Sequence, residues 1–471
     1  MSRLVIVSNR VTVPEPGKPP PPGGLAVAVK AAFKDRPGVW FGWSGKIDDN
    51  PNTEPAVVER DGITYVVTDL ASADHQEYYN GFANRVLWPI LHYRVDLAEF
   101  SRSDLSGYLR VNGLFADKLS KILQPDDLVW VHDYHLIPLA RELRSRGHQN
   151  PLGFFLHIPC PPPDLLFTIP RQEQSLGVMS HYDLIGFQTD NDRDNYARYL
   201  QISGAHMARD GSSYQHDGRV TRIGTFPVGI ETADYAAEAE TATKSEFLRE
   251  LRDSLSGRQM FIGVDRLDYS KGIVHRIEGF DHFLETEPTW RNRVVFLQVT
   301  PKSRAEIPEY GDMSRAVNEL VGDVNGRFGE AAWTPIRYIN RSYGRSDLAG
   351  VFREAAAALV TPLRDGMNLV AKEYVAAQDK EDPGVLILSQ FAGAAAELDG
   401  AVMVNPHETE GMAAAMKTAL MMPRDERKSR HTAMFARIEK HDIAHWVESF
   451  LGRLAESKKP PFMAQIRSLF S

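Results

Sequence analysis

Short, wholly apolar runs recur along this chain, and each ends in polar residues that lead into a helix-like stretch. The first run covers residues 4–7 and is followed by Asn9 and Arg10. Continuous apolar runs are typical of strands covered on both faces, as in a parallel sheet. Eleven runs fit this description: 4–7, 128–131, 153–156, 184–187, 223–228, 260–264, 294–299, 336–339, 358–360, 385–388 and 401–404.

Eleven strands exceed what one strongly twisted open sheet usually holds, which is about ten. The chain has 471 residues, and this length also predicts two domains. We therefore expect an α/β fold with two doubly wound, Rossmann-like domains of five or six strands each, facing across a cleft. We place the N-terminal domain at 1–230 and the C-terminal domain at 231–441. Residues 442–471 are expected to hold a helix docked back on the body, because 442–456 carries an apolar stripe at helical spacing.

The charge and the cysteine content limit the partners and the compartment. The formal net charge is -8, which argues against a general nucleic-acid binder because such proteins need a basic surface. The apolar run at the N-terminus is too short for a signal peptide, and no run approaches the ~18 residues of a membrane helix. The single cysteine, Cys160, cannot form an internal disulfide. We expect a cytoplasmic protein with neither nucleic-acid nor membrane partners.

Cations are concentrated just after the predicted strands, where open parallel sheets bind their ligands. Each of them alone also fits a helix cap or a solvated surface charge. Together, in an acidic protein, they indicate a site for phosphorylated ligands. The residues are Arg10, Arg266, Lys271, Lys302, Arg304 and Arg364.

Two loops carry the most specific patterns. In the first, Arg266 and Lys271 precede Gly272 and a helix-like stretch. Two cations beside a helix N-terminus could clamp a diphosphate and stabilise the charge that develops on it. The pair Gly23-Gly24 also precedes a helix-like stretch and could approach an anion closely, although a plain turn fits it equally well.

The second loop, 364–373, follows the apolar run 358–360. Gly366 permits a sharp turn, and Asn368 is a natural helix N-cap. The free backbone N–H groups of the next two residues can then meet a phosphate. Asp365 and Glu373 could accept hydrogen bonds from sugar and ribose hydroxyls. An ordinary capped helix is the alternative interpretation.

Metal and nucleophile sites are poorly supported by the sequence. His132 and His135 lack a third ligand nearby, and the Asp190-Asn-Asp192 sequence fits the start of a helix. We predict no metal site, so Arg266 and Lys271 would have to neutralise a diphosphate themselves. The dinucleotide fingerprint, the P-loop and the G-x-S-x-G motif are all absent from the sequence. A catalytic role for Cys160 is disfavoured because His157 is its only neighbouring residue with cationic potential.

At these residues the chain resembles the trehalose-6-phosphate synthases, which are retaining glycosyltransferases of the GT-B type. The resemblance runs through nearly the whole length and follows one order of motifs. These motifs are Val-Ser-Asn-Arg10, Gly23-Gly24-Leu, Tyr-Tyr79-Asn, Val-Leu-Trp88-Pro, His-Asp133-Tyr-His-Leu, Phe-Leu-His157-Ile-Pro, Arg266-Leu-Asp-Tyr-Ser-Lys271-Gly, Ser-Arg304 and Asp365-Gly-Met-Asn-Leu-Val-Ala-Lys-Glu373.

The resemblance implies transfer of glucose from UDP-glucose to glucose-6-phosphate, with retention and without an enzyme nucleophile. It implies that the acceptor is bound by Arg10, Tyr79, Trp88, Asp133 and Arg304. It implies that the donor is bound by Gly23, Gly24, His157, Arg266, Lys271, Tyr343, Asp365, Gly366, Met367, Asn368, Leu369, Val370 and Glu373. The catalytic residues it implies are Asp133, His157, Arg266 and Lys271.

The same resemblance implies no cofactor and assembly as a homo-dimer or homo-tetramer. Three alternatives stay open: a glucosylglycerol-phosphate synthase, a catalytically silent regulatory homologue, and, least supported, a Rossmann oxidoreductase. Arg10 and Arg304 would serve any phosphorylated acceptor, whereas Tyr79, Trp88 and Asp133 favour a complete sugar. UDP is the family's usual donor nucleotide, but the sequence leaves GDP and ADP open. The proline-rich loop 13–22 is a candidate lid beside Arg10.

Overall fold

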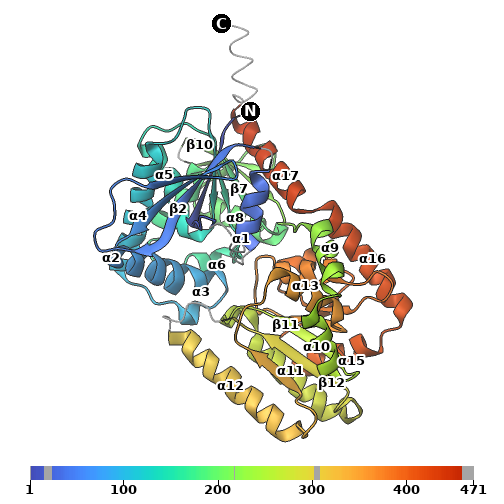
Figure 1. Cartoon of the computed structure of the whole chain (residues 1–471). Coiled ribbons are helices and arrows are strands. Elements are labelled where there is room, and N and C mark those ends of the chain that lie inside the picture. Colours follow the sequence, from blue (N-terminus) through green and yellow to red (C-terminus); the bar gives the residue numbers. More distant parts are fainter. Residues whose placement is uncertain (1, 15–23, 35, 217, 302–307, 459–471) are drawn as a thin grey trace. The chain divides into compact units, whose positions relative to one another are not determined.

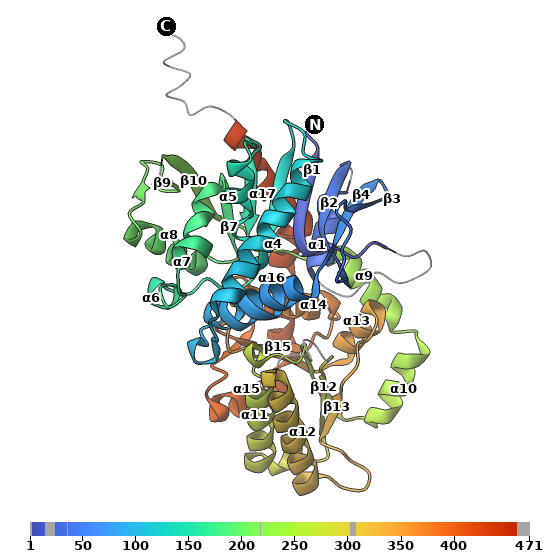
Figure 2. The same ribbon diagram turned by 90° about the vertical axis from the view of Figure 1, so that its left-hand side faces the viewer.

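The computed structural model describes residues 2–14, 24–34, 36–216, 218–301 and 308–458. The chain divides into two compact units. Unit 1 comprises residues 1–227 together with 446–471, and unit 2 comprises 228–445. Figures 1 and 2 show the elements of both units. Within the described ranges, no helix is long and apolar enough to cross a membrane.

Unit 2 contains a six-stranded sheet in the order β13-β12-β11-β14-β15-β16, with every pair parallel. This is the 3-2-1-4-5-6 order of dinucleotide-binding folds, whose ligands bind where the order reverses. The reversal lies between β11 and β14, so the loops that follow these two strands border the expected crevice. The strands are β11 (Gln259–Val264), β12 (Val294–Val299), β13 (Ile336–Ile339), β14 (Ala357–Val360), β15 (Val385–Ser389) and β16 (Val402–Val404).

The helices of unit 2 form two contacting groups, as expected when crossovers cover both faces of a parallel sheet. The first group is α11 (Ile273–Thr286), α12 (Pro308–Phe328) and α15 (Thr409–Met421), of which α11 and α12 lie side by side in Figure 2. The second group is α9 (Thr232–Ala242), α10 (Glu246–Leu255), α13 (Arg345–Glu354), α14 (Leu369–Ala377) and α16 (Arg424–Lys440).

Unit 1 contains a ten-stranded sheet in the order β3-β4-β2-β1-β5-β6-β7-β10-β9-β8. The seven strands from β4 to β10 in this order are parallel, and β3, β9 and β8 pair antiparallel at the two edges. The strands are β1 (Leu4–Arg10), β2 (Gly38–Ile47), β3 (Ala56–Arg60), β4 (Ile63–Leu70), β5 (Leu128–His132), β6 (Leu152–Phe155), β7 (Leu184–Phe187), β8 (His206–Met207), β9 (Ser213–His216) and β10 (Arg219–Thr225).

All eleven predicted runs overlap strands, but the expectation of five or six strands in each domain is wrong for unit 1. The strands β2 and β4 were missed because polar residues and glycine interrupt their apolar runs. In β2, for example, Gly42 packs so tightly that an added Cβ would lie 2.9 Å from Val11 Cγ2. Close backbone approach at this glycine interrupts the run of buried apolar side chains in the strand.

The aromatic stretch of unit 1 folds as a 13-residue π-helix, η1 (His75–Leu87), which continues into α3 (Trp88–Leu91). Wide helical turns of this kind are rare and are frequently found at functional sites. This helix carries Tyr79 and presents Trp88 at its end. The other helices of unit 1 are α1 (Gly24–Ala32), α2 (Ser72–Asp74), α4 (Arg102–Ser120), α5 (Leu139–Ser145), α6 (Pro163–Leu166), α7 (Gln172–Ser175) and α8 (Asp190–Ile202).

The helix α17 (Ile443–Ala455) supplies part of the core of unit 1, and Figure 1 shows it in red beside that sheet. The Phe450 ring stacks on Trp130 of β5, with centroids 4.5 Å apart. An added Cβ at Gly153 or Gly186 would lie 2.8 Å from the Phe450 ring. The glycines of β6 and β7 therefore leave the space that this aromatic ring fills.

Truncating Phe450 to alanine is expected to lower the free energy of unfolding by about 3–5 kcal/mol, because a fully buried ring leaves a cavity. Urea denaturation followed by tryptophan fluorescence measures the loss. The matched control is Phe167→Ala, since Phe167 is 39% exposed and should cost less than about 1 kcal/mol. Equal losses in the two variants would contradict the assigned packing of α17.

Candidate active site

Five of the predicted site residues lie at one end of the unit 1 sheet, at the last residue of β1, after β5 and β6, and along η1 and α3. These strands are neighbours in the order β1-β5-β6, so their carboxyl ends lie together. The residues are Arg10, Tyr79, Trp88, Asp133 and His157.

Arg10 and Tyr79 share one aromatic neighbour, Trp43 of β2. The Arg10 guanidinium lies 5.9 Å from the Trp43 ring, and the Tyr79 ring lies 5.9 Å from the same indole. Arg10 also packs flat on Gly45, where an added Cβ would lie 2.7 Å from Nε. A cation and a phenol thus lie beside one indole at this sheet edge, an arrangement that would suit an anion.

Asp133 is held in an unusual backbone conformation, with φ 74° and ψ 163°. Such angles are adopted almost only by glycine and cost of order 1–3 kcal/mol in other residues. Two hydrogen bonds fix the position: Asp133 N donates to the Phe155 carbonyl at 2.8 Å, and Oδ1 accepts from His157 N at 3.4 Å. The next residue, Tyr134, contacts the buried Trp88 ring at 5.6 Å. The structure thus brings Trp88, Asp133 and His157 into one group.

His157 is half-buried after β6, and its Nε2 lies 3.0 Å from Nδ1 of His132. Burial lowers the pKa of His157 to about 3, so the imidazole is neutral at neutral pH. Trp446 of α17 packs beside it, with ring centroids 6.1 Å apart. His157 is therefore suited to hydrogen bonding rather than to a charged contact.

In unit 2, the loops after β11 and β14 meet through an ion pair. Lys271 Nζ lies 2.5 Å from Asp365 Oδ2, although the residues are far apart in sequence. Asn368 Nδ2 donates to the same carboxylate oxygen at 3.1 Å. The structure thus brings Lys271, Asp365 and Asn368 together at the topological switch point, where doubly wound sheets bind ligands.

A buried arginine that sequence reasoning missed ties these two loops to each other. Arg276 of α11 is fully buried and pairs with Asp265 at 2.6 Å. Its Nε donates to Thr361 Oγ1 at 2.9 Å, and its other nitrogens reach the Lys271 carbonyl at 3.3 Å and Gln298 at 3.0 Å. The five-residue spacing from Lys271 was the only signal in the sequence, and it resembles that of any helix interior.

Asn368 takes the N-cap position of α14, as predicted, but its side chain makes no capping hydrogen bond there. Its backbone is left-handed, with φ 71°, a conformation that asparagine tolerates better than most residues. Because its amide is turned toward Asp365, the N–H groups of Leu369 and Val370 are not capped by it. This leaves the start of α14 suited to an anion. Gly366 and Met367, which precede it, are buried.

Glu373 lies one turn into α14. Burial raises the pKa of its carboxyl to about 7, and Arg345 offsets part of that rise. Arg345 is shared, because it also bonds Glu231 at 2.8 Å and lies over the Tyr235 ring at 5.3 Å. Glu373 therefore titrates near neutral pH.

Replacing Glu373 by glutamine should remove one pH-dependent term from the stability. The folded carboxyl keeps its proton to about pH 7, whereas an unfolded glutamate releases it near its ordinary pKa of about 4.3. The protonated carboxyl of Glu373 therefore contributes its full stability below about pH 4.3. This contribution is lost as the pH rises to about 7. Urea denaturation between about pH 5 and pH 8 should show the wild type losing stability relative to Glu373→Gln.

Glu381→Gln is the control for this experiment, because Lys428 lowers the pKa of the exposed Glu381. That variant should differ from the wild type by a constant amount over the same range. A pH-independent difference between wild type and Glu373→Gln would contradict the titration assigned to Glu373.

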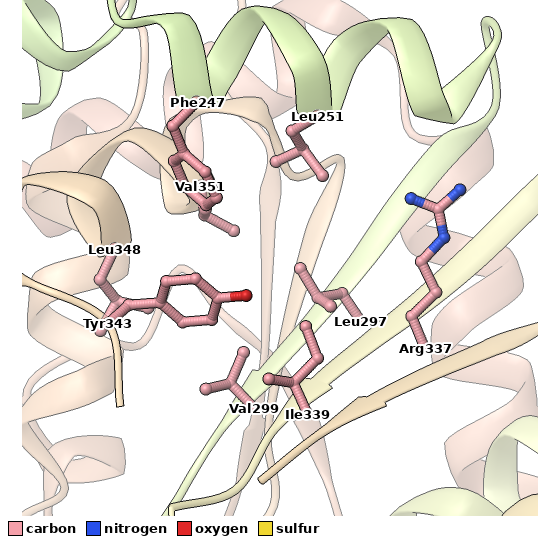
Figure 3. Close-up of a pocket in the computed structure, with 9 residues that line it drawn as sticks. All are labelled: Phe247, Leu251, Leu297, Val299, Arg337, Ile339, Tyr343, Leu348 and Val351. Atoms are coloured by element: carbon pink, nitrogen blue, oxygen red, sulfur yellow. The ribbon is translucent and has the colours of Figure 1, made fainter. Parts of the chain in front are cut away.

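Tyr343 borders an apolar cavity of about 80 Å³ between α10, α13 and the ends of β12 and β13. Figure 3 shows the Tyr343 ring reaching into this cavity, with its hydroxyl toward the centre. Its ring lies 5.4 Å from Phe247, and its hydroxyl accepts from Arg341 at 3.2 Å. Since β12 separates β13 from β11, Tyr343 lies two strands away from the Lys271 loop.

The remaining predicted residues divide by what the structure describes. Gly23, Arg304, Lys302 and residues 15–22 of the candidate lid lie outside the described residues. Gly24 begins α1, and Arg266 is exposed after β11.

Cys160 and Asp192, which were considered for thiol and metal chemistry, take part in local hydrogen bonds. Asp192 accepts from Cys160 N at 2.8 Å and donates its own N–H to Thr189, the actual N-cap of α8. Burial raises the pKa of the Cys160 thiol. Within the described ranges, no group of three or more His, Cys, Asp or Glu is placed to hold a metal ion.

Comparison with known proteins finds relatives that match almost the whole chain. A protein from Sinorhizobium fredii (strain NBRC 101917 / NGR234) called trehalose-6-phosphate synthase is 53% identical over 97% of this chain and 99% of its own. A crystal structure of an alpha,alpha-trehalose-phosphate synthase (UDP-forming) from Burkholderia xenovorans, in complex with glucose-6-phosphate, matches with a TM-score of 0.92. It is 43% identical, over 96% of this chain and 100% of its own.

An Escherichia coli structure bound with UDP-2-fluoro glucose also has a TM-score of 0.92, with 44% identity over 98% of this chain and 100% of its own. The resemblance and the doubly wound GT-B class predicted from the sequence are both confirmed. A family model described as Glycosyltransferase family 20 matches residues 3–456. Because that match spans nearly the whole sequence, the chain belongs to glycosyltransferase family 20.

Proposed function

We propose that this chain transfers glucose from UDP-glucose to glucose-6-phosphate, giving α,α-trehalose-6-phosphate and UDP. The observation that carries the proposal is the near-complete match to solved family members, one holding glucose-6-phosphate and another UDP-2-fluoro glucose. The cations at the strand ends support it independently, because both substrates are anionic.

Unit 1 is the acceptor side in this proposal. Arg10 and Tyr79, which pack on the same indole, bind the phosphate of glucose-6-phosphate together with Arg304. Trp88 and Asp133 position the sugar, and the strained backbone of Asp133 fixes the direction of its carboxylate. His157 lies beside the transferred glucose.

Unit 2 is the nucleotide-sugar side. Arg266 and Lys271 and the N–H groups of Leu369 and Val370 bind the diphosphate. The glycine pair Gly23-Gly24, which is also assigned to the donor, belongs to unit 1. Asp365 accepts hydrogen bonds from sugar hydroxyls, and Glu373 accepts hydrogen bonds from the ribose hydroxyls. Gly366, Met367 and Asn368 form the turn between Asp365 and α14, and Tyr343 borders the base. UDP is the donor nucleotide that the family relatives support.

The reaction is a front-face displacement. The bond between the anomeric carbon and the leaving phosphate oxygen breaks, and its electron pair stays on that oxygen. The acceptor hydroxyl attacks from the same face, and its proton passes to the leaving phosphate. Lys271 and Arg266 stabilise the charge on the departing diphosphate, while Asp133 and His157 orient the two sugars.

The proposal includes no cofactor, a cytoplasmic location and a homo-oligomer, either a dimer or a tetramer. The single cysteine supports a reducing compartment. Light scattering of the purified protein gives the oligomeric state, and a monomeric mass would contradict the assembly.

A coupled assay for UDP release tests the activity, with glucose-6-phosphate, glycerol-3-phosphate or no acceptor. Release with glucose-6-phosphate alone, lost in Arg10→Ala and Arg304→Ala, is the expected result. Release only with glycerol-3-phosphate would make the chain a glucosylglycerol-phosphate synthase. No release with any acceptor, but calorimetric binding of UDP, would indicate a silent homologue.

A further inference from the structure

Behind His157 lies a second histidine to which the reaction described above gives no role. His132 is the last residue of β5, and none of its surface is exposed. Its Nδ1 lies 3.0 Å from His157 Nε2, and the two rings stack with centroids 5.3 Å apart. The ring also packs against Trp130 at 4.6 Å and Trp446 at 6.2 Å. Among the residues that the structure describes, the polar neighbour of His132 Nδ1 is therefore His157.

A hydrogen bond between two imidazoles restricts where their protons lie. Burial lowers the pKa of both rings, so each is neutral and carries one N–H. One ring must donate across the 3.0 Å contact, and the other must accept. The direction of this hydrogen bond therefore fixes whether the other nitrogen of each ring carries a proton or a lone pair.

The surroundings of His132 decide the direction. Its Nε2 is buried and has no hydrogen-bond partner among the described residues. The indole N–H groups of Trp130 and Trp446 in the same cluster are also buried without partners in the described part of the chain. A third unpartnered N–H there would be costly, since orphaned buried donors are rarer than orphaned acceptors. The lone pair therefore belongs on His132 Nε2 and the proton on its Nδ1.

We propose that His132 is a positioning residue that holds His157 in the Nδ1–H tautomer, so that His157 donates a hydrogen bond to a hydroxyl oxygen of the transferred sugar. His132 Nδ1–H donates to His157 Nε2, which leaves the His157 proton on Nδ1. His157 is half-buried, so this second nitrogen is the one left for a ligand. The inference rests on the proposed function, because that function places a sugar beside His157.

The coupling matters because a neutral histidine in water favours the Nε2–H tautomer. Without His132, nothing would fix the position of the His157 proton, and the ring could present either a lone pair or a donor to the sugar. A sugar hydroxyl could still donate a hydrogen bond to a lone pair on His157. That hydrogen could then not be donated to any other acceptor. The buried pair removes this ambiguity before substrate arrives, which is a form of preorganisation.

Nitrogen-15 spectra of histidine-labelled protein test the coupling without any substrate. Protonated and unprotonated ring nitrogens have well-separated shifts, and His157→Gln assigns the His157 signals. We expect a protonated Nδ1 on His157 in the wild type and the Nε2–H form in His132→Met, whose sulfur can accept a hydrogen bond but cannot donate one. An Nε2–H form in the wild type, or an unchanged His157 in His132→Met, would overturn the proposal.

Kinetics separate this role from simple packing. His132→Asn and His132→Leu are a matched pair of similar size, but only asparagine places an N–H near the position of Nδ1. We expect kcat/KM for UDP-glucose to fall about tenfold in the leucine variant, as for one lost hydrogen bond, and to recover in the asparagine variant. The KM for glucose-6-phosphate should stay unchanged in both. Equal losses in the two variants would overturn the proposal.

The activity assay and the tautomer measurement can contradict the proposed function and the histidine coupling independently of each other. If the wild-type protein made no trehalose phosphate but showed the expected His157 tautomer, the proposed function would fail while the histidine coupling held. If it made the product but carried the other tautomer, the coupling would fail while the function held. Melting temperatures within a few degrees of the wild type confirm that each variant is folded.

Discussion

Replacing Lys271 by methionine is expected to lower kcat/KM for UDP-glucose about a thousandfold, within the range seen when one transition-state contact is removed. Methionine keeps much of the side chain's length and bulk but removes its charge. The diphosphate of the donor would lose one of its two cations as negative charge builds on it. Steady-state rates of UDP release at saturating glucose-6-phosphate measure the effect.

The loss should exceed that of a simple cation deletion because Lys271 neutralises Asp365 at 2.5 Å. In the methionine variant that carboxylate keeps its negative charge without the lysine, in a site that must accept an anion. Adding Asp365→Asn removes the repulsion, so the double variant should lose less than the product of the two single losses. Strict multiplication of the single effects would show that the pair is not coupled during the reaction.

The control is Lys428→Met on α16. This change breaks an exposed ion pair with Glu381 and should leave the rate unchanged. The KM for glucose-6-phosphate should also be unchanged in Lys271→Met, since Lys271 is not among the residues assigned to the acceptor. A variant that keeps a tenth or more of the wild-type kcat/KM would contradict the role given to Lys271.

Asp133→Gly should produce opposite effects on stability and on activity. Glycine adopts φ 74° and ψ 163° freely, so the strain at this position is released, less the entropy that glycine loses on folding. We expect the free energy of unfolding to rise by about 1 kcal/mol. The rate with glucose-6-phosphate should fall at least a hundredfold, because the carboxylate that positions the acceptor is lost.

Asp61→Gly is the matched control for the backbone effect. Asp61 also has positive φ, at 52°, but it lies exposed in the turn between β3 and β4. That change should leave the rate unaltered. Urea denaturation and initial rates on the same preparations separate the two quantities. A strongly destabilised Asp133→Gly would contradict the strain assigned to this backbone, because the hydrogen bond that its carboxylate accepts from His157 N is long, at 3.4 Å, and costs little to lose.

The parallel cores and the two cationic loops of unit 2 were predictable because their signals are local. Strands buried on both faces require continuous apolar runs, and ligands then lie beyond the strand ends. This placed Lys271 and Asp365 on the two loops that the structure joins by an ion pair. The contact itself joins residues 94 positions apart, and no periodicity in the sequence encodes such a distance.

Other features could not be read from the sequence because tertiary packing overrides the local pattern. The π-helix His75–Leu87 has no periodicity of its own that separates it from a broken α-helix. Asn368 has the composition of a capping residue, but its amide is drawn to Asp365. Arg276 and His132 look like surface residues in the sequence and are fully buried in the fold.

The return of α17 to the first sheet has a consequence for how the protein is made. Trp130 and Phe155 stay uncovered until Phe450 emerges from the ribosome, since this ring packs against both. At typical rates of about 5–20 residues per second, the intervening unit takes roughly 10–40 s to synthesise. The contiguous second unit can complete its fold in that time, so the unit begun first is finished last. During this interval its open aromatic face is a natural substrate for chaperones that bind nascent chains.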